Sequence, residues 1–199
     1  HDLLLPAFQV VGAQVGAVWL ILPFVLQSAE VWQKAVARLE NYLDRLEGYT
    51  KGTVVIATVF GDVHDIGKSL VNTILSNNGY TVIDLGKQVP ISTILDAAQE
   101  HKATAIGLSA LLVSTSKQMP LGVAELHQQG LPYPVLIGGA AINRDFGLRI
   151  LYPGGKESEE IYEPGVFYCK DAFEGLAKMD QLIDPEARIA LVEKTRASA

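Results

Sequence analysis

Residues 61–68 read GDVHDIGK and place His64 between the carboxylates of Asp62 and Asp65. Asp62 precedes His64 by two residues, so its carboxylate can accept a hydrogen bond from one ring nitrogen and leave the other nitrogen for a metal. A single histidine in a loop is more often solvated than bound to a metal. The interpretation of His64 as a metal ligand therefore depends on its spacing from Asp62. Gly67 lets the chain turn tightly and lets a bulky ligand approach the backbone. The stretch therefore predicts a metal ligand at His64.

Small polar residues and glycines follow two further apolar runs. Ser109 ends one run, and the hydroxyls of residues 114–116 open the stretch after it. Gly138 and Gly139 end another run, where two residues without side chains leave a slot. Helix capping and turn formation explain each of these features separately. Taken with His64, they predict one site that has a metal ligand, polar groups for a ligand tail and a glycine-lined groove.

The elements that position these residues alternate regularly along the chain. Short apolar runs are typical of buried strands, and each is followed by a stretch with helical periodicity. This order predicts an α/β fold with a five-stranded, parallel, doubly wound sheet of the flavodoxin or Rossmann-like kind and a ligand at the carboxyl ends of its strands. Residues 152–164 are rich in Gly, Glu and Pro, which predicts an exposed loop. The expected strands are 53–59, 81–84, 105–109, 135–137 and 165–168, and the expected helices are 68–78, 91–100, 115–129, 143–150 and 171–182.

Residues 3–26 contain no charged side chain, which raises the possibility of a membrane span. Prolines, glutamines and glycines interrupt this run, no basic segment precedes it, and residues 28–47 are amphipathic. We therefore expect a partial helical bundle, truncated at its start, over residues 1–47, and the absence of an initial Met favours a fragment. A linker at 48–52, an α/β domain at 53–184 and a helix or tail at 185–199 complete the expected organisation.

The composition excludes several classes of protein. With 49% hydrophobic and 19% charged residues, the 199-residue chain can bury a core, so it is not disordered. Its net charge of −6 leaves no surplus of basic residues for nucleic acid. Cys169 is the only cysteine, which excludes an internal disulfide and fits a reducing, cytoplasmic compartment.

Three parts of the sequence together resemble the signature of cobalamin-binding domains, DxHxxG…SxL…GG. They are Asp62-x-His64-x-x-Gly67, Ser109-x-Leu111 and Gly138-Gly139, in that order. The resemblance implies that cobalamin binds with its nucleotide base off the cobalt and buried beside the sheet. It implies that His64 replaces that base as the lower cobalt ligand, that Asp62 tunes His64, that Thr115 extends the relay and that Ser109 bonds the buried base.

Within that family, the chain is most similar to the cobalamin-dependent methionine synthases, in residues 61–68, 82–90, 107–115 and 137–150 and at the paired positions 11–12, 22–23 and 28–29. This implies that residues 1–47 cap the upper face of the corrin, with Val15 and Leu22 over it. It also implies that methylcobalamin carries a methyl group from methyltetrahydrofolate to homocysteine, with His64, Asp62 and Thr115 as catalytic residues. The implied cofactor contacts are Gly61, Asp62, Val63, His64, Asp65, Ile66, Gly67, Ser109, Leu111, Thr115, Gly138, Gly139, Ala140, Val15 and Leu22.

The implied partners are homocysteine-binding, folate-binding and reactivation modules of the same longer protein, with no nucleic acid and no membrane. Alternatives are a corrinoid shuttle protein of methanol or methylamine metabolism, a photosensor and a non-catalytic cobalamin-binding module. A photosensor is expected to carry a Trp that is followed at a fixed spacing by Glu-His. Neither Val15 nor Trp19 is followed by that pair. An adenosylcobalamin mutase shares the DxHxxG motif but usually lacks the cap.

Overall fold

The computed structural model describes residues 50–155 and 160–198. The chain divides into two compact units, residues 1–49 and 50–199, and the second is described below. The expected helical bundle, with Val15 and Leu22, lies outside the described residues, as does the charge-free run at 3–26. In the described part of the chain, no helix has the length and apolarity needed to cross a membrane.

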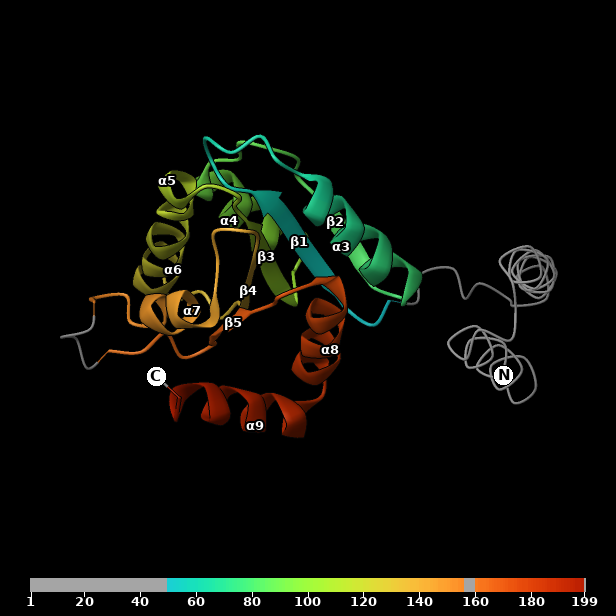
Figure 1. The fold of residues 1–199 in the computed structure, drawn as a ribbon. Helices are drawn as coiled ribbons and strands as arrows, with labels where there is room; N and C mark the ends of the chain where they lie inside the picture. The colour runs from blue at the N-terminus through green and yellow to red at the C-terminus, as the bar shows by residue number, and fades with distance from the viewer. Residues whose placement is uncertain (1–49, 156–159, 199) are drawn as a thin grey trace, which may run out of the picture. The chain divides into compact units, whose positions relative to one another are not determined.

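Five parallel strands form one sheet in the order β2-β1-β3-β4-β5 (Figure 1). Each strand is a short run of β-branched and apolar residues, which suits a sheet covered on both faces. Thr58 pairs with Ser109, and Ser109 pairs with Gly138, so the carboxyl ends of β1, β3 and β4 meet at one edge. The strands are β1 Thr53–Thr58, β2 Thr81–Asp84, β3 Ala105–Ser109, β4 Val135–Gly138 and β5 Val166–Tyr168.

Helices cover both faces of this sheet (Figure 1). The first group, α3 and α8, packs together on one face, and α9 packs against α8. The second group, α4, α6 and α7, shares the core of the other face. The helices are α3 Ile66–Asn77, α4 Ile91–Glu100, α5 Val113–Ser116, α6 Gln118–Gln128, α7 Arg144–Ile150, α8 Ala172–Ile183 and α9 Pro185–Arg196.

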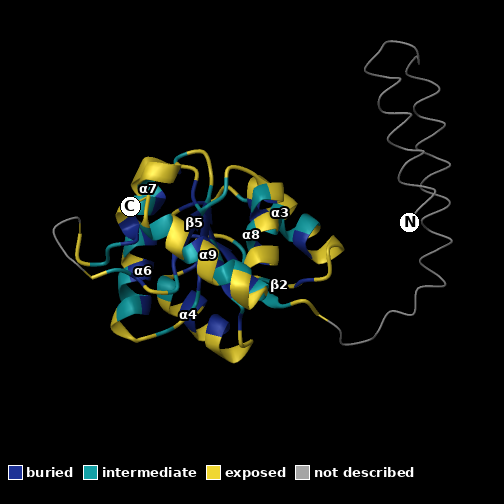
Figure 2. Ribbon diagram, turned by 90° about the horizontal axis from the view of Figure 1, so that it is seen from below, coloured by how far each residue is buried: buried dark blue, intermediate teal, exposed yellow. Residues whose placement is uncertain are grey.

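The two faces have separate apolar cores, and in Figure 2 the buried sides of the helices turn inward while their exposed sides face outward. Ile106, Leu108 and Ile137 belong to the larger core, under α4 and α6. Their neighbours Ala105 and Leu136 belong to the smaller core, under α3 and α8. Alternate residues of a strand point to opposite faces, so each strand contributes to both cores.

These strands and helices confirm the α/β fold expected from the sequence, with two local differences. The helix expected at 115–129 is divided at Lys117 into α5 and α6. Pro120 has no backbone N–H to donate to the carbonyl of Ser116, and proline is tolerated in the first turn of a helix, so a new helix begins there. The helix expected from Lys68 begins at Ile66.

The loop before β5 is less exposed than its composition indicates. Tyr162 is 1% exposed, and its hydroxyl donates to the carbonyl oxygens of Leu131 at 2.9 Å and Tyr133 at 2.7 Å. A buried tyrosine needs such a partner for its hydroxyl. Gly154, Gly155, Glu160 and Glu163 are exposed, as expected for this loop, whereas Tyr162 anchors it to the turn before β4.

Candidate functional site

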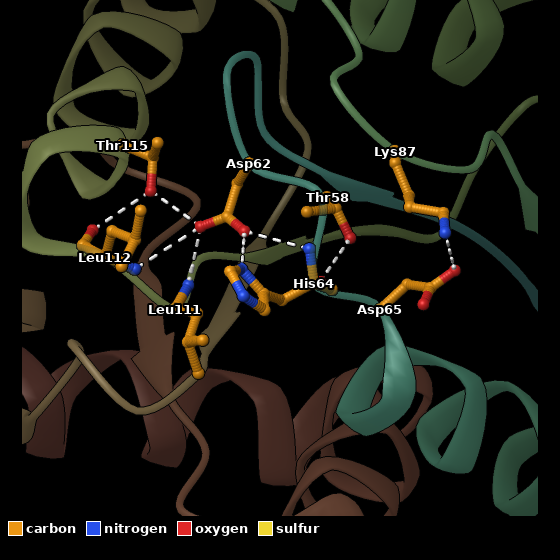
Figure 3. Close-up of polar contacts among 8 residues, drawn as sticks. All are labelled: Thr58, Asp62, His64, Asp65, Lys87, Leu111, Leu112 and Thr115. Carbon is orange, nitrogen blue, oxygen red and sulfur yellow. Dashed lines mark hydrogen bonds and ion pairs between the residues drawn. The ribbon is translucent and has the colours of Figure 1, made fainter.

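The loop between β1 and α3 places a buried carboxylate beside a half-exposed imidazole. Asp62 is 0% exposed, whereas the side chain of His64 is 48% exposed. Asp62 Oδ1 accepts hydrogen bonds from the His64 backbone N–H at 3.0 Å and from His64 Nδ1 at 2.9 Å (Figure 3). Thr58 Oγ1 also donates to the His64 carbonyl at 3.2 Å. The spacing of two residues thus fixes both the backbone and the ring of His64.

The second oxygen of the same carboxylate binds the segment after β3. Asp62 Oδ2 accepts from the backbone N–H groups of Leu111 at 2.8 Å and Leu112 at 3.3 Å, and from Thr115 Oγ1 at 2.6 Å (Figure 3). Asp62 therefore ties together two loops that are about fifty residues apart in the chain. The structure brings Asp62, His64, Leu111 and Thr115 together.

These contacts fix the charge of Asp62 and the tautomer of His64. Burial acts to raise the pKa of Asp62, but the hydrogen bonds from Thr115 and from the backbone N–H groups of His64 and Leu111 outweigh it and hold this pKa well below its usual range. An ionised Asp62 only accepts, so the proton of a neutral His64 ring lies on Nδ1. No described residue hydrogen-bonds His64 Nε2, so this nitrogen is left to bind a ligand.

Apolar side chains are exposed on the loops that carry this network. A cluster of exposed apolar residues is unfavourable in water and marks a binding surface. Val63 and Ile66 flank His64 in the chain, and Ile66 is 89% exposed. The segment that holds Asp62 adds three more such residues, Leu111, Leu112 and Val113. We call these five residues the apolar rim.

A cavity of about 420 Å³ lies on the α3 and α8 face of the sheet. Four of the residues predicted to contact the cofactor line it: Ser109, Gly138, Gly139 and Ala140. Gly67, also predicted, lines it from α3, where a Cβ atom would meet only open space. The cavity is therefore a slot between the two helices whose walls include the carboxyl ends of β3 and β4.

Gly139 is required by the backbone at the end of β4. It has a φ of +123°, and a Cβ atom there would lie 2.0 Å from the carbonyl oxygen of Ala110. No other residue fits so close an approach, which brings the ends of β3 and β4 together. The pair Gly138-Gly139 is thus both a strand end and part of the cavity wall.

The sequence did not reveal every residue of the site. Lys68, Tyr168, Cys169 and Gly175 also line the cavity. Burial raises the pKa of Cys169 to about 12, so its thiol stays neutral in the cavity wall. Thr58, which donates to the His64 carbonyl, was also missed, although a polar residue at the end of an apolar run was a signal for it. Tyr168 in β5 and Gly175 in α8 carried no such signal. Asp65 does not join His64, because its carboxylate turns to Lys87, with 3.4 Å between Oδ2 and Nζ (Figure 3).

Comparison with known proteins agrees with this site. Residues 52–150 match the family model described as B12 binding domain. The chain is 44% identical over 198 residues to the methionine synthase of Mycobacterium leprae, covering 96% of this chain and 16% of that protein. It is 45% identical over 186 residues to the methionine synthase of Mycobacterium tuberculosis, covering 92% of this chain and 15% of that protein. The chain thus spans about a sixth of the length of these relatives.

Two solved structures are similar over most of the chain. The methanol:cobalamin methyltransferase complex of Methanosarcina barkeri is 29% identical, with a TM-score of 0.62, over 98% of this chain and 70% of that one. A cobalamin-binding protein of Desulfitobacterium hafniense is 27% identical, with a TM-score of 0.60, over 89% of this chain and 78% of that one.

The residues present fit such a cofactor. His64 offers one nitrogen ligand, and among the described residues no three His, Cys, Asp or Glu side chains gather as a metal site. The apolar rim suits a large, mainly apolar ring, and the cavity offers room for a tail. The chain therefore belongs to the family of the B12 binding domain, and its cofactor is cobalamin.

Proposed function

We propose that this chain is the cobalamin-carrying module of a methionine synthase, which transfers a methyl group from methyltetrahydrofolate to homocysteine. The observation that carries the proposal is the Asp62–His64 pair, which occupies Nδ1 and leaves Nε2 of a half-exposed ring for a ligand, in a loop that also carries part of the apolar rim. Identities of 44% and 45% to methionine synthases support this choice of reaction. Because the chain spans only 16% and 15% of those relatives, the substrates are assigned to other modules of a longer protein.

Bound cobalamin supplies a cobalt centre to which a methyl group can be attached and from which it can be removed. His64 Nε2 is the residue atom that would hold this cobalt. Asp62 accepts a hydrogen bond from Nδ1–H and thereby fixes the orientation and tautomer of the His64 ring. Thr115 and the backbone of Leu111 act through Asp62, so they are positioning residues.

His64 and Asp62 hold the Nδ1 proton between them, with 2.9 Å between Nδ1 and Asp62 Oδ1. Asp62 is the ionised acceptor in this pair, because its hydrogen bonds hold its pKa well below the usual range. The pair therefore keeps Nε2 as the ring nitrogen that would hold a metal.

The cavity between α3 and α8 is proposed to hold the nucleotide tail. Ser109 offers a hydroxyl to the base of the tail, and Gly138, Gly139 and Ala140 provide a wall without bulky side chains. The remaining sequence-predicted contacts, Gly61, Val63, Asp65, Ile66 and Gly67, belong to the His64 loop and the first turn of α3 beneath the ring. Gly61 has a φ of +82°, which turns the chain toward Asp62.

The remaining parts of the proposal concern the rest of the protein. As part of the same proposal, residues 1–47, with Val15 and Leu22, are assigned to a corrin-capping helical bundle, and residues 48–52 are assigned to a linker before the domain at 53–184. Homocysteine-binding, folate-binding and reactivation modules are the partners, and the cytoplasm is the compartment. The single cysteine, which can form no internal disulfide, supports the choice of compartment.

A ligand substitution tests the assignment of His64. The chain is loaded with methylcobalamin, and its absorption spectrum and dissociation constant are compared with those of His64→Gly. We expect the substitution to convert the spectrum to that of cobalamin without a nitrogen ligand. Asp62→Asn should weaken His64 coordination by about 10- to 100-fold. His101→Gly, at the exposed end of α4, is the matched control. Identical spectra for the original chain and His64→Gly contradict the assignment.

A transfer assay tests the reaction. The loaded chain is mixed with the homocysteine-binding and folate-binding modules of a mycobacterial methionine synthase, and labelled methyl groups are followed. Transfer from methyltetrahydrofolate to homocysteine is the expected result. Transfer from methanol in place of methyltetrahydrofolate, when the methanol-binding subunit is supplied, assigns the chain to the corrinoid shuttle proteins instead.

A further inference from the structure

Two segments of the chain have the same order of residue types and lie side by side. Residues 65–68 read DIGK and begin α3, and residues 84–87 read DLGK and leave β2. Their charges pair crosswise, with Lys68 bound to Asp84 and Lys87 bound to Asp65. We call this arrangement the crossed clasp.

The Lys68–Asp84 pair is the buried half of the clasp. The Lys68 side chain is 4% exposed and that of Asp84 is 24% exposed. Asp84 also accepts from the backbone N–H of Gly86 at 2.9 Å and from Asn72 Nδ2 at 3.4 Å. A buried ion pair with further hydrogen bonds is costly to break from one side, because the remaining charge stays buried. This half therefore fixes the first turn of α3 to the end of β2.

The start of α3 lacks the contact that normally fixes a helix there. Asp65 is the N-cap residue and has a suitable side chain, but it makes no capping hydrogen bond. Its carboxylate pairs with Lys87 instead, at 3.4 Å (Figure 3). By contrast, the N-cap side chains of α7, α8 and α9 all accept backbone hydrogen bonds. The clasp thus holds the start of α3, at the end of the loop that carries His64, where no side-chain cap is made.

Backbone bonds extend the clasp to the loop itself. The N–H of Gln88 donates to the carbonyl of Asp62 at 3.1 Å, and the N–H of Val89 donates to that of Thr58 at 3.0 Å. Gln88 takes a φ of +53°, which is unusual for a residue other than glycine and is held here by these contacts. The segment after β2 therefore supports the His64 loop on the side away from Leu111.

We infer that Lys68 and Asp84 are positioning residues for His64, and that the crossed clasp keeps the His64 loop in place before cobalamin binds. The part of this inference that concerns cobalt coordination rests on the proposed function, whereas order in the cofactor-free loop does not. Lys87 and Asp65, with side chains 49% and 32% exposed, are the weaker half.

The experiment compares Lys68→Met with Lys68→Arg in the whole 199-residue chain. Hydrogen exchange of residues 60–68 is measured without cofactor, and the spectrum is measured with methylcobalamin. We expect Lys68→Met to speed this exchange by about tenfold and to lower the fraction of cobalamin coordinated by His64. Lys68→Arg, which keeps the positive charge, should show the exchange rate and the coordinated fraction of the original chain. Lys51→Met is the matched control, because it removes a 3.6 Å ion pair near the other end of β1.

Unchanged exchange and an unchanged spectrum in folded Lys68→Met overturn the inference. If that variant does not fold, Lys87→Met decides, because it breaks only the exposed pair. Exchange of residues 62–66 is then expected to rise severalfold; no rise overturns the clasp. A different result would show that the proposed function fails while the clasp stands. If the original chain and His64→Gly give the same spectrum, His64 is not the cobalt ligand. The hydrogen exchange of the cofactor-free chain then tests the clasp by itself.

Discussion

The two faces of the sheet are built from the same strands, but side chains fill the space on one face and leave a cavity on the other. On the α4 and α6 face, β3 presents Ile106 and Leu108, which are 1% and 5% exposed in the larger core. On the α3 and α8 face, the residues that alternate with them are Ala105, Gly107 and Ser109, and the last two line the cavity. A strand can therefore stabilise a fold through one face and leave space for a ligand on the other.

Glycines in α8 and α6 show the same difference in packing between the two faces. Gly175, in α8, lines the cavity, and a Cβ atom there would touch nothing within 4 Å. A Cβ atom at Gly122, in α6, would lie 2.9 Å from Ile91 Cδ1. The first glycine leaves space unfilled, whereas the second permits close packing. We interpret the α3 and α8 face as the part of the domain where packing is incomplete until the cofactor binds.

The largest expected effect comes from creating a void in the core on the α4 and α6 face. Ile106→Ala should lower the free energy of unfolding by about 2–5 kcal/mol, because it removes buried methyl and methylene groups and leaves a void. Affinity for cobalamin should stay within a few-fold of the original, since Ile106 faces away from the cavity. Urea unfolding and a cobalamin titration measure the two quantities. Ile106→Val is the control, with an expected loss of about 0.5–1.5 kcal/mol.

Filling the cavity on the α3 and α8 face should have the opposite pattern, with a loss of cobalamin affinity and no loss of stability. Ser109→Leu is expected to weaken cobalamin binding by roughly 10- to 100-fold, because overpacking an occupied site costs about 1–3 kcal/mol. Stability without cofactor should not fall, since the new side chain enters existing space. Binding is followed by absorption titration, with Ser109→Ala as the control. Undiminished affinity in Ser109→Leu would place the tail outside the cavity.

The smallest effect compares the two helical glycines. Gly175→Ala should stabilise the cofactor-free domain by about 0.5–1 kcal/mol, because alanine is the better helix former and meets no atom. It should also weaken cobalamin binding a few-fold by narrowing the cavity. Gly122→Ala should give no such gain, because its methyl group meets Ile91. Equal gains from both substitutions, measured by urea unfolding, contradict a difference in packing between the faces.

Much of the fold follows from local patterns in the sequence. Apolar runs at 53–59, 81–84 and 105–109 have the length and β-branched content of buried strands, and the structure confirms them. The division at Lys117 also had a local signal, namely the proline three residues later. Tyr162 had none, because its burial depends on carbonyl groups about thirty residues away.

The site was predictable where its spacing is local or its motif is shared. The contact of Asp62 with His64 follows from two-residue spacing, and the structure shows it. The contacts of Asp62 with Leu111 and Leu112 depend on how β1 and β3 pair. The cavity depends on register as well, because only the alignment of Gly107, Ser109 and Gly138 on one face shows that small residues gather there. Pairing and register are properties of the folded sheet, which no single segment encodes.

The strand order has a consequence for how this domain tolerates change. The chain leaves β1 toward α3 on one face and leaves β3 toward α6 on the other, so a crevice opens between neighbouring strand ends. Chain direction, and not any one side chain, creates that opening. Substitutions along the crevice can therefore change which molecule is accepted without removing the place where it binds. The scaffold and its ligand preference can accordingly diverge at different rates during evolution.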